Sequence, residues 1–372
     1  MTIKYNWQQA DWPHFRYDLS KVYETLFAIA EKIGLITGKL SHLTENLQTE
    51  TMINLMVEEA VKTSKIEGEN ISRPDIRSSI KNKLGLNQQL VRVHDKRASG
   101  IAELLLDVRH TFQQSLTEDK LFDWHLMLLS GSTHPDHSIG CWRTGEEPMQ
   151  IVSGHYGQFV HYEAPPAGDV PKEMERFIHW FNQTAPGKPQ AIKFAPVRAA
   201  IAHLYFESIH PFEDGNGRMG RVIAEKALSQ GFGYPVIFSL SKALEAEKKD
   251  YYAALHVASK SNELTAWIAY FVSVVLTAQI EMETEINFII KKSIFFDKFE
   301  AVLNERQLKV VRRMLQAGTK GFIGGMSAKK YMVITGSSKA TATRDLQHLV
   351  KIQALKQTGS GRSVHYELNL FI

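Results

Sequence analysis

The sequence predicts a mainly α-helical protein: a helical bundle with one β-hairpin on its surface, followed by a helix-and-hairpin domain at the C-terminal end. Apolar residues recur at helical spacing through most of the 372 residues, whereas the alternation typical of strands is confined to short stretches. Hydrophobic and charged residues make up 44% and 23% of the chain. These fractions are ordinary for a globular protein and exclude disordered and collagen-like classes.

Besides the helix at 218–229 described below, seven segments before the C-terminal domain have the apolar periodicity of helices. They are 19–36, 51–67, 91–112, 120–129, 171–184, 195–209 and 265–288. A chain of this length has room for two or three domains. We expect a helical N-terminal region at 1–115, a core at 116–280 and a C-terminal domain at 293–372.

The composition also bears on the compartment. A single cysteine, Cys141, excludes a disulfide framework and a cysteine-rich zinc site, and we expect it to be a small buried residue. The first residues contain no apolar signal segment. The most apolar run, 267–276, is about half the length of a membrane span and predicts a buried helix. We therefore expect a cytoplasmic protein with no membrane contact.

A β-hairpin is predicted where the helical pattern is interrupted. Residues 149–152 and 159–162 have strand character around a turn at 153–158 that contains two glycines. Pro165-Pro166 ends the second strand. From these residues alone, the segment is a surface hairpin that covers the bundle.

The C-terminal domain has the element order of a winged helix. Its predicted helices and strands lie at 306–316, 327–334, 338–349, 354–357 and 363–368. Residues 293–372 contain 13 Lys and Arg and 5 Asp and Glu, a net charge of +8, against −4 for the other residues. The third helix presents a polar face made of Lys339, Thr341, Thr343, Arg344 and Gln347. DNA binding and a protein-interaction or dimerisation role both fit this surface.

The most informative segment is His210-Pro-Phe-Glu-Asp-Gly-Asn-Gly-Arg-Met-Gly-Arg221. His is the side chain most easily poised near neutral pH, so His210 is a candidate general base. Asp214 offers the hard oxygen ligand that Mg²⁺ prefers. Gly215 and Gly217 let backbone N–H groups approach an anion without a Cβ in the way.

A helix predicted over 218–229, with Gly231 as its stop, begins at this segment. The Gly-Asn-Gly sequence then lies at a helix N-terminus, where free N–H groups and the helix dipole favour phosphate. Arg218 and Arg221 are three residues apart and share a face of that helix. The chain has neither a P-loop nor a kinase signature, so phosphate handling depends on this segment.

The segment resembles the signature of the Fic family, His-Pro-Phe-x-Asp/Glu-Gly-Asn-Gly-Arg-x-x-Arg, at every defined position. Fic proteins are mostly nucleotidyltransferases that move AMP from ATP onto a hydroxyl side chain of a target protein. The resemblance covers about 121–277 and implies a helical Fic-type bundle. It also implies a protein adenylyltransferase that uses ATP and Mg²⁺, with a Tyr, Thr or Ser hydroxyl as acceptor.

The resemblance assigns roles to the residues of the segment. His210 takes the proton of the attacking hydroxyl, and Asp214 holds Mg²⁺. Phe212 anchors the loop. The implied phosphate-binding residues are Gly215, Asn216, Gly217, Arg218 and Arg221.

Two further parts of the chain are similar to Fic elements. Tyr251 and Tyr252 resemble the tyrosine pair that lines the adenine pocket, although half-buried helix packing explains them equally well. Ser259 stands where some relatives have Asn, and the chain departs from the family pattern at that position. The predicted hairpin resembles the Fic flap, which covers the nucleotide and pairs with an extended target segment; its flap residues are Val160, His161 and Tyr162.

The sequence Thr63-Ser-Lys-Ile-Glu67-Gly68 resembles the Fic inhibitory motif, Ser/Thr-x-x-x-Glu-Gly/Asn. Thr63 and Glu67 lie one turn apart on a helix that ends at Gly68, the residue type most often found at the C-terminal end of a helix. The resemblance implies an inhibitory helix at 51–68 whose Glu67 pairs with Arg221 and blocks a productive γ-phosphate. A surface Glu near a helix end is the alternative.

The expected function is thus a self-inhibited protein adenylyltransferase that also modifies itself. Removal of AMP from a modified protein and transfer of UMP, phosphate or phosphocholine are alternatives. A non-enzymatic alternative is a DNA-binding regulator whose Fic core senses a nucleotide. DNA and a second copy of the chain remain open as partners.

Overall fold

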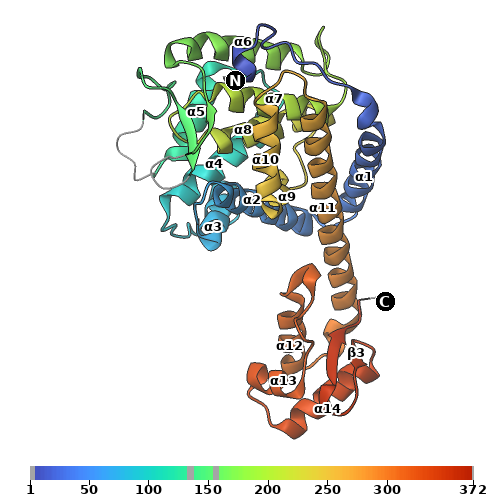
Figure 1. The fold of residues 1–372 in the computed structure, drawn as a ribbon. Helices are drawn as coiled ribbons and strands as arrows, with labels where there is room; N and C mark the ends of the chain where they lie inside the picture. The colour runs from blue at the N-terminus through green and yellow to red at the C-terminus, as the bar shows by residue number, and fades with distance from the viewer. Residues whose placement is uncertain (1–4, 132–137, 154–158, 371–372) are drawn as a thin grey trace. The chain divides into compact units, whose positions relative to one another are not determined.

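The computed structural model of the chain describes residues 5–131, 138–153 and 159–370 and is mainly helical (Figure 1). These residues form fourteen α-helices and two antiparallel hairpins, which confirms the predicted fold class. They divide into two compact units. The first is Met1–Leu35 with Thr44–Gln279, and the second is Ile36–Leu43 with Ile280–Ile372.

Nine helices lie wholly in the described part of the first unit. They are α2 (Glu45–Ile66), α3 (Arg73–Lys83), α4 (Lys96–His110), α5 (Glu118–Leu129), α6 (Val170–Gln183), α7 (Ala195–Ile209), α8 (Asn216–Phe232), α9 (Leu240–Ala246) and α10 (Lys248–Ala258). Two longer helices, α1 (Tyr23–Ser41) and α11 (Thr265–Phe299), contribute residues to both units. The helices α3, α9 and α10 were not predicted from the periodicity.

The packed pair α7 and α8 forms the centre of the first unit. Both helices are buried over almost their whole length, and α7 has the predicted bounds. The prediction that Gly231 ends α8 is wrong, because the helix continues to Phe232 and is capped by Gly233 with φ 83°. A Cβ at Gly231 would overlap the side chain of Ala195, so this glycine serves the close contact between the two helices.

The predicted hairpin consists of β1 (Gln150–Ser153) and β2 (Phe159–Glu163), with Ile151 opposite Tyr162. Its predicted turn falls largely on 154–158, which lie outside the described residues. The Tyr162 hydroxyl donates to the Ser208 carbonyl at 2.6 Å and fixes β2 to the end of α7.

The expectation of a buried Cys141 is wrong, since this residue is exposed. The next two residues take the interior positions instead. Trp142 is 8% exposed and Arg143 is 4% exposed. The backbone therefore turns the cysteine side chain outward.

The second unit contains α12 (Glu305–Leu315), α13 (Ala328–Thr335), α14 (Lys339–Lys351), β3 (Leu355–Thr358) and β4 (His365–Leu368). Val310, Tyr331 and Leu346 are fully buried in its core. On α14, Lys339, Arg344 and Gln347 are exposed, while Thr341 and Thr343 are half-buried. The order of elements is the predicted one, and the winged-helix interpretation stays a prediction.

By length and composition α11 could cross a membrane, and half of its apolar window is buried inside the structure. A core helix of a soluble protein passes the same test. The apolar run considered in the sequence is only a part of this helix, which has 35 residues.

Candidate active site

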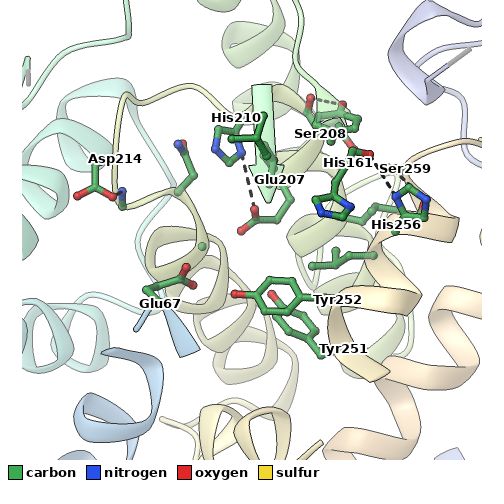
Figure 2. A pocket seen from close by; sticks show the side chains of 18 of the residues that line it. Glu67, His161, Glu207, Ser208, His210, Asp214, Tyr251, Tyr252, His256 and Ser259 are labelled. Carbon is green, nitrogen blue, oxygen red and sulfur yellow. Dashed lines mark hydrogen bonds and ion pairs between the residues drawn. The ribbon is translucent and has the colours of Figure 1, made fainter. Parts of the chain in front are cut away.

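A cavity of about 520 Å³ opens in the first unit beside the turn between α7 and α8 (Figure 2). Its polar end is lined by His210 and by the first residues of α8. Its other end is lined by the hairpin and by α10, with Ile151, Tyr252 and Leu255. The C-terminal end of α2 reaches the same cavity through Glu67.

His210 follows the last residue of α7 and adopts the left-handed conformation, with φ 51° and ψ 59°. This conformation is unusual for a residue with a side chain. Arg143 stabilises it, because Nε donates to the His210 carbonyl at 2.8 Å and Nη2 donates to the Pro165 carbonyl at 2.5 Å. The turn thereby directs the imidazole into the cavity (Figure 2).

The imidazole of His210 is neutral at physiological pH. Burial, and then the positive charge of Arg143, lower the pKa of His210 to about 4. Glu207 lies one turn earlier on α7, with Oε2 3.9 Å from Nδ1 of His210. Burial and the nearby Glu67 carboxylate raise the pKa of Glu207 to about 8. An uncharged carboxyl group and an unprotonated histidine therefore lie side by side near pH 7.

The loop after His210 is locked by Phe212 and Asn216. The ring of Phe212 is buried and stacks on His125 with ring centroids 3.9 Å apart, as expected for an anchor. The Asn216 amide accepts from the Phe212 N–H at 2.9 Å and donates to its carbonyl at 2.7 Å. The Asn216 side chain thus holds the loop closed through the backbone of Phe212.

The start of α8 leaves backbone donors free for an anion. The first N–H bonded within the helix is that of Met219, to the Gly215 carbonyl at 2.9 Å. The N–H groups of 216–218 therefore have no acceptor in the helix. Gly215 caps the helix with φ 83°, which favours glycine, and a Cβ at Gly217 would overlap the Glu67 carboxylate. Free donors and the positive dipole end together favour a phosphate.

Two buried arginines stand on the first turns of α8. Arg218 is 4% exposed and Arg221 is 2% exposed. Arg218 Nη1 contacts Glu69 Oε1 at 2.8 Å, and its Nη2 lies 3.4 Å from Asp214 Oδ2. Arg221 Nη2 contacts Glu67 Oε1 at 2.7 Å. Although burial disfavours its charge, the Glu67 carboxylate raises the pKa of Arg221 above its ordinary value.

The residues of the predicted inhibitory motif meet Arg221. Thr63 Oγ1 accepts from Arg221 Nε at 2.7 Å, and the Thr63 carbonyl accepts from Nη2 at 3.0 Å. Glu67 is the C-cap of α2, and Gly68 follows in the left-handed conformation with φ 84°. The helix end thus places the Glu67 carboxylate over the start of α8, inside the cavity (Figure 2).

Several buried polar atoms around the cavity have no hydrogen-bond partner, which is uncommon in folded proteins. They are His210 Nδ1, Glu207 Oε1, Arg218 Nε, Arg221 Nη1 and Glu69 Oε2. Because most buried polar groups are satisfied, such a concentration indicates a site that binds a polar ligand.

The two tyrosines have different surroundings. Tyr251 is buried, and its hydroxyl lies 2.8 Å from Nε2 of His203. Tyr252 is 42% exposed, lines the cavity and donates to the Ile66 carbonyl at 3.3 Å. Both tyrosines therefore line the cavity, and Tyr251 also packs in the core. Ser259 is buried at the far end of the same cavity.

The hairpin residues also divide between wall and anchor. Val160 is exposed, His161 lines the cavity and Tyr162 is buried. The His161 carbonyl lies 3.1 Å from Nδ1 of His256 on α10. Strand β2 is therefore held by one hydrogen bond to the end of α7 and by another to α10.

Sequence reasoning missed Arg143, Glu207, Glu69 and His256. Glu207 could have been found, since it precedes His210 by three residues on one helix face. Arg143 and His256 reach the site only through tertiary folding. No local pattern marks them.

The site thus combines a helix start with free N–H donors, two buried arginines nearby and a neutral histidine at its edge. In a helical protein, these groups suit a phosphorylated ligand. Residues 115–228 match the Fic/DOC family, and the chain therefore carries a Fic domain. Residues 5–86 match a domain of unknown function, DUF4172.

Known proteins with the same domain support this assignment. Protein adenylyltransferase Fic of Nematostella vectensis is 28% identical over 201 residues, which are 52% of this chain and 41% of the relative. The chain thus spans less than half the length of that relative. A Fic family protein from Desulfovibrio desulfuricans G20 has the same fold, with a TM-score of 0.56 at 21% identity over 96% of this chain and 98% of that one. A Fic domain containing signaling protein from Bacteroides thetaiotaomicron has a TM-score of 0.54 at 19% identity and covers 70% of this chain and 95% of that one.

Proposed function

We propose that the chain is a self-inhibited protein adenylyltransferase, which transfers AMP from ATP to a Tyr, Thr or Ser hydroxyl of a target protein. One observation carries the proposal. His210 and the first residues of α8 line one cavity, and Arg218 and Arg221 stand on the first turns of the same helix, where Arg221 contacts Glu67 of the cavity wall. A base beside a triphosphate-binding turn is what transfer from an α-phosphate requires.

In the proposed reaction the target hydroxyl oxygen attacks the α-phosphorus, a new P–O bond forms, and the bond to pyrophosphate breaks. The hydroxyl proton passes to His210, which is neutral because burial lowers its pKa to about 4. A positioned base of this kind contributes roughly 10²- to 10⁴-fold.

The phosphates are held by fixed donors. The N–H groups at 216–218 stabilise charge on the transferred phosphate. Arg218 and Arg221 bind the β- and γ-phosphates and hold the leaving group in line. The apolar end of the cavity, with Tyr252 and Leu255, has the character of a nucleoside-binding wall.

Asp214 is the residue that would hold Mg²⁺. Among the described residues, no group of three or more His, Cys, Asp or Glu forms a metal site. A single carboxylate fits Mg²⁺ nonetheless, because this ion is often bound by one or two carboxylates together with the substrate phosphates. When bound, Mg²⁺ neutralises phosphate charge.

Glu67 supplies the inhibition in this proposal. Its carboxylate occupies Arg221 at 2.7 Å and lies against Gly217, where a phosphate would approach the helix start. A carboxylate and a phosphate cannot share this guanidinium without strong like-charge repulsion. Displacement of Glu67 is therefore required before a productive γ-phosphate binds.

The hairpin is the proposed docking element for the target. Within the described residues it is a sheet of two strands only, so no further strand pairs with the outer edge of β1. An extended target segment can add to such an edge through main-chain hydrogen bonds. Tyr162 fixes β2 to the Ser208 carbonyl of α7, two residues before His210.

Incubation with ATP labelled at the α-phosphate tests the proposal. We expect Glu67→Gly to raise self-modification and His210→Ala to abolish it. The matched control is Glu103→Gly, which changes an exposed partner of Lys83 on α4. Equal labelling of the wild type and Glu67→Gly would refute the inhibition, and label arriving only from the γ-position would refute AMP transfer.

A further inference from the structure

We propose that Glu69 is a second inhibitory carboxylate, which withholds Arg218 from the nucleotide as Glu67 withholds Arg221. This inference rests on the proposed function, because it assigns a regulatory role at the same site. It changes the expected behaviour of the chain, since removal of Glu67 alone would release only one of the two guanidinium groups.

The two glutamates make equivalent contacts. Glu69 Oε1 lies 2.8 Å from Arg218 Nη1, and Glu67 Oε1 lies 2.7 Å from Arg221 Nη2. Both carboxylate side chains are 29% exposed, while the arginine side chains are 4% and 1% exposed. Each guanidinium is therefore buried and charge-paired with one acid from the same segment, and a phosphate must compete with that acid.

The end of α2 places both acids together. The Gly68 N–H donates to the Lys65 carbonyl at 3.1 Å, and the Glu69 N–H donates to the Ser64 carbonyl at 3.0 Å. These two bonds form the Schellman motif, in which a left-handed glycine reverses the chain at a helix end. Glu67 and Glu69 thus flank Gly68 and are fixed by one capping structure.

Glu69 also has a second cation nearby. Its Oε2 lies 3.9 Å from Nη1 of Arg97, on the first turn of α4, and has no hydrogen-bond partner. Asp95 holds Arg97 in place at 2.8 Å. When a phosphate takes Arg218, Glu69 can turn to Arg97 without leaving its charge unpaired. Arg97 therefore lowers the cost of releasing Arg218.

Arg218 also faces Asp214, whose Oδ2 lies 3.4 Å from Nη2. With two carboxylates around it, the guanidinium presents little net positive charge to a triphosphate. Removal of the Glu69 charge leaves Arg218 with one acid and one free side. We therefore expect nucleotide affinity to rise by this substitution alone.

The experiment is a double-mutant cycle on the full chain. The proteins are the wild type, Glu67→Gln, Glu69→Gln and the double variant, with Glu103→Gln as the matched control. The Kd of α,β-methylene-ATP with Mg²⁺ is measured by calorimetry, and self-modification with α-labelled ATP is measured in parallel. We expect each single variant to tighten binding about tenfold, the double variant to bind more tightly than either, and the control to match the wild type.

A further pair separates regulation from a merely structural contact. Arg97→Gln removes the alternative partner, so it should weaken nucleotide binding in the wild type and have no effect when Glu69 is already Gln. A contrary result is that Glu69→Gln changes the Kd by less than twofold, both in the wild type and in the Glu67→Gln variant, while Glu67→Gln itself still tightens binding. That result overturns the inference. If no variant binds the analogue, the proposed function itself fails, and the inference with it.

Discussion

Arg143 Nε donates a hydrogen bond to the carbonyl of His210 at 2.8 Å. Among the described residues of the α7–α8 turn, His210 is the one non-glycine residue in the left-handed conformation, and this contact fixes it there. The same guanidinium donates to the Ile209 carbonyl at 3.4 Å and to the Pro165 carbonyl. Non-glycine residues in this conformation cost about 1–2 kcal/mol. Arg143 is thus a positioning residue that holds the proposed base through its backbone.

Arg143→Met should reduce the rate of AMP transfer roughly 10- to 100-fold with little change in nucleotide Kd, because a small displacement of a base slows proton transfer. Three carbonyls lose a donor, so we also expect the free energy of unfolding to fall by about 1–3 kcal/mol. Rates and Kd are measured in the Glu67→Gly background. Arg176→Met, at an exposed arginine on α6, is the control. A changed Kd with an unchanged rate would contradict the positioning role.

The pH dependence of AMP transfer should extend well below neutrality. Burial and the Arg143 charge lower the pKa of His210 to about 4 from the ordinary 6.5, so the imidazole stays unprotonated as the pH falls through 6.5. We expect Glu67→Gly to keep most of its transfer rate at pH 5.5. Initial rates with α-labelled ATP between pH 5 and 8 check this. An acid limb centred near pH 6.5 would show that the imidazole is solvated.

Glu207 should make stability fall as the pH rises. Its pKa is raised from 4.5 to about 8, mainly by burial and then by Glu67, so between these values the folded protein holds a proton that the unfolded chain releases. The contribution is fully present below pH 4.5 and is lost as the pH rises through 8. Glu207→Gln removes this dependence. Relative to the wild type it should gain roughly 3 kcal/mol between pH 5 and pH 8.

Urea unfolding at these two pH values provides the measurement, with Glu103→Gln as an exposed control. A constant difference between Glu207→Gln and the wild type would mean that the Glu207 carboxyl titrates normally. Glu67→Gln should shift the dependence to lower pH, because the Glu67 charge contributes to the raised pKa of Glu207.

The tyrosine pair offers a matched comparison. The Tyr252 hydroxyl donates to the Ile66 carbonyl and ties α10 to the end of α2. Tyr252→Phe should therefore raise self-modification about two- to fivefold at nearly unchanged stability, since a hydrogen bond contributes about 0.5–1.5 kcal/mol. Tyr251→Phe removes the partner of buried His203 and should instead lower stability by about 1–3 kcal/mol. Thermal unfolding and labelling are measured for both variants. Equal effects of the two variants on stability and on self-modification would contradict the different roles of the two tyrosines.

The sequence predicts this fold best where one signal dominates. Helix α7 is buried on all sides, starts at Ala195-Pro196 and ends before Pro211, and its bounds are as predicted. By contrast, α3 has 11 residues and α9 has 7, which is too short for a clear periodicity. Their starts are marked by the capping side chains of Ser72 and Ser239, a signal that periodicity alone does not use.

The site divides in the same way. Residues 210–221 are contiguous, so their chemistry could be predicted from the sequence. Arg143 and Glu69 acquire their roles only when separate segments meet, and their contacts depend on side-chain distances that no spacing encodes. Asn216 shows the converse: its position at the start of α8 could be predicted, but the contact of its side-chain amide with Phe212 could not.

Because the Schellman motif fixes Glu67 and Glu69 to the end of α2, the length of this helix determines where both carboxylates lie. Each residue of an α-helix advances the chain by about 100° around the axis. One extra residue inside α2 would therefore rotate Glu67 and Glu69 away from α8 together, even though no contact residue had been exchanged. An insertion or deletion in this helix would therefore move both carboxylates in a single step, an evolutionary change that point substitutions cannot reproduce.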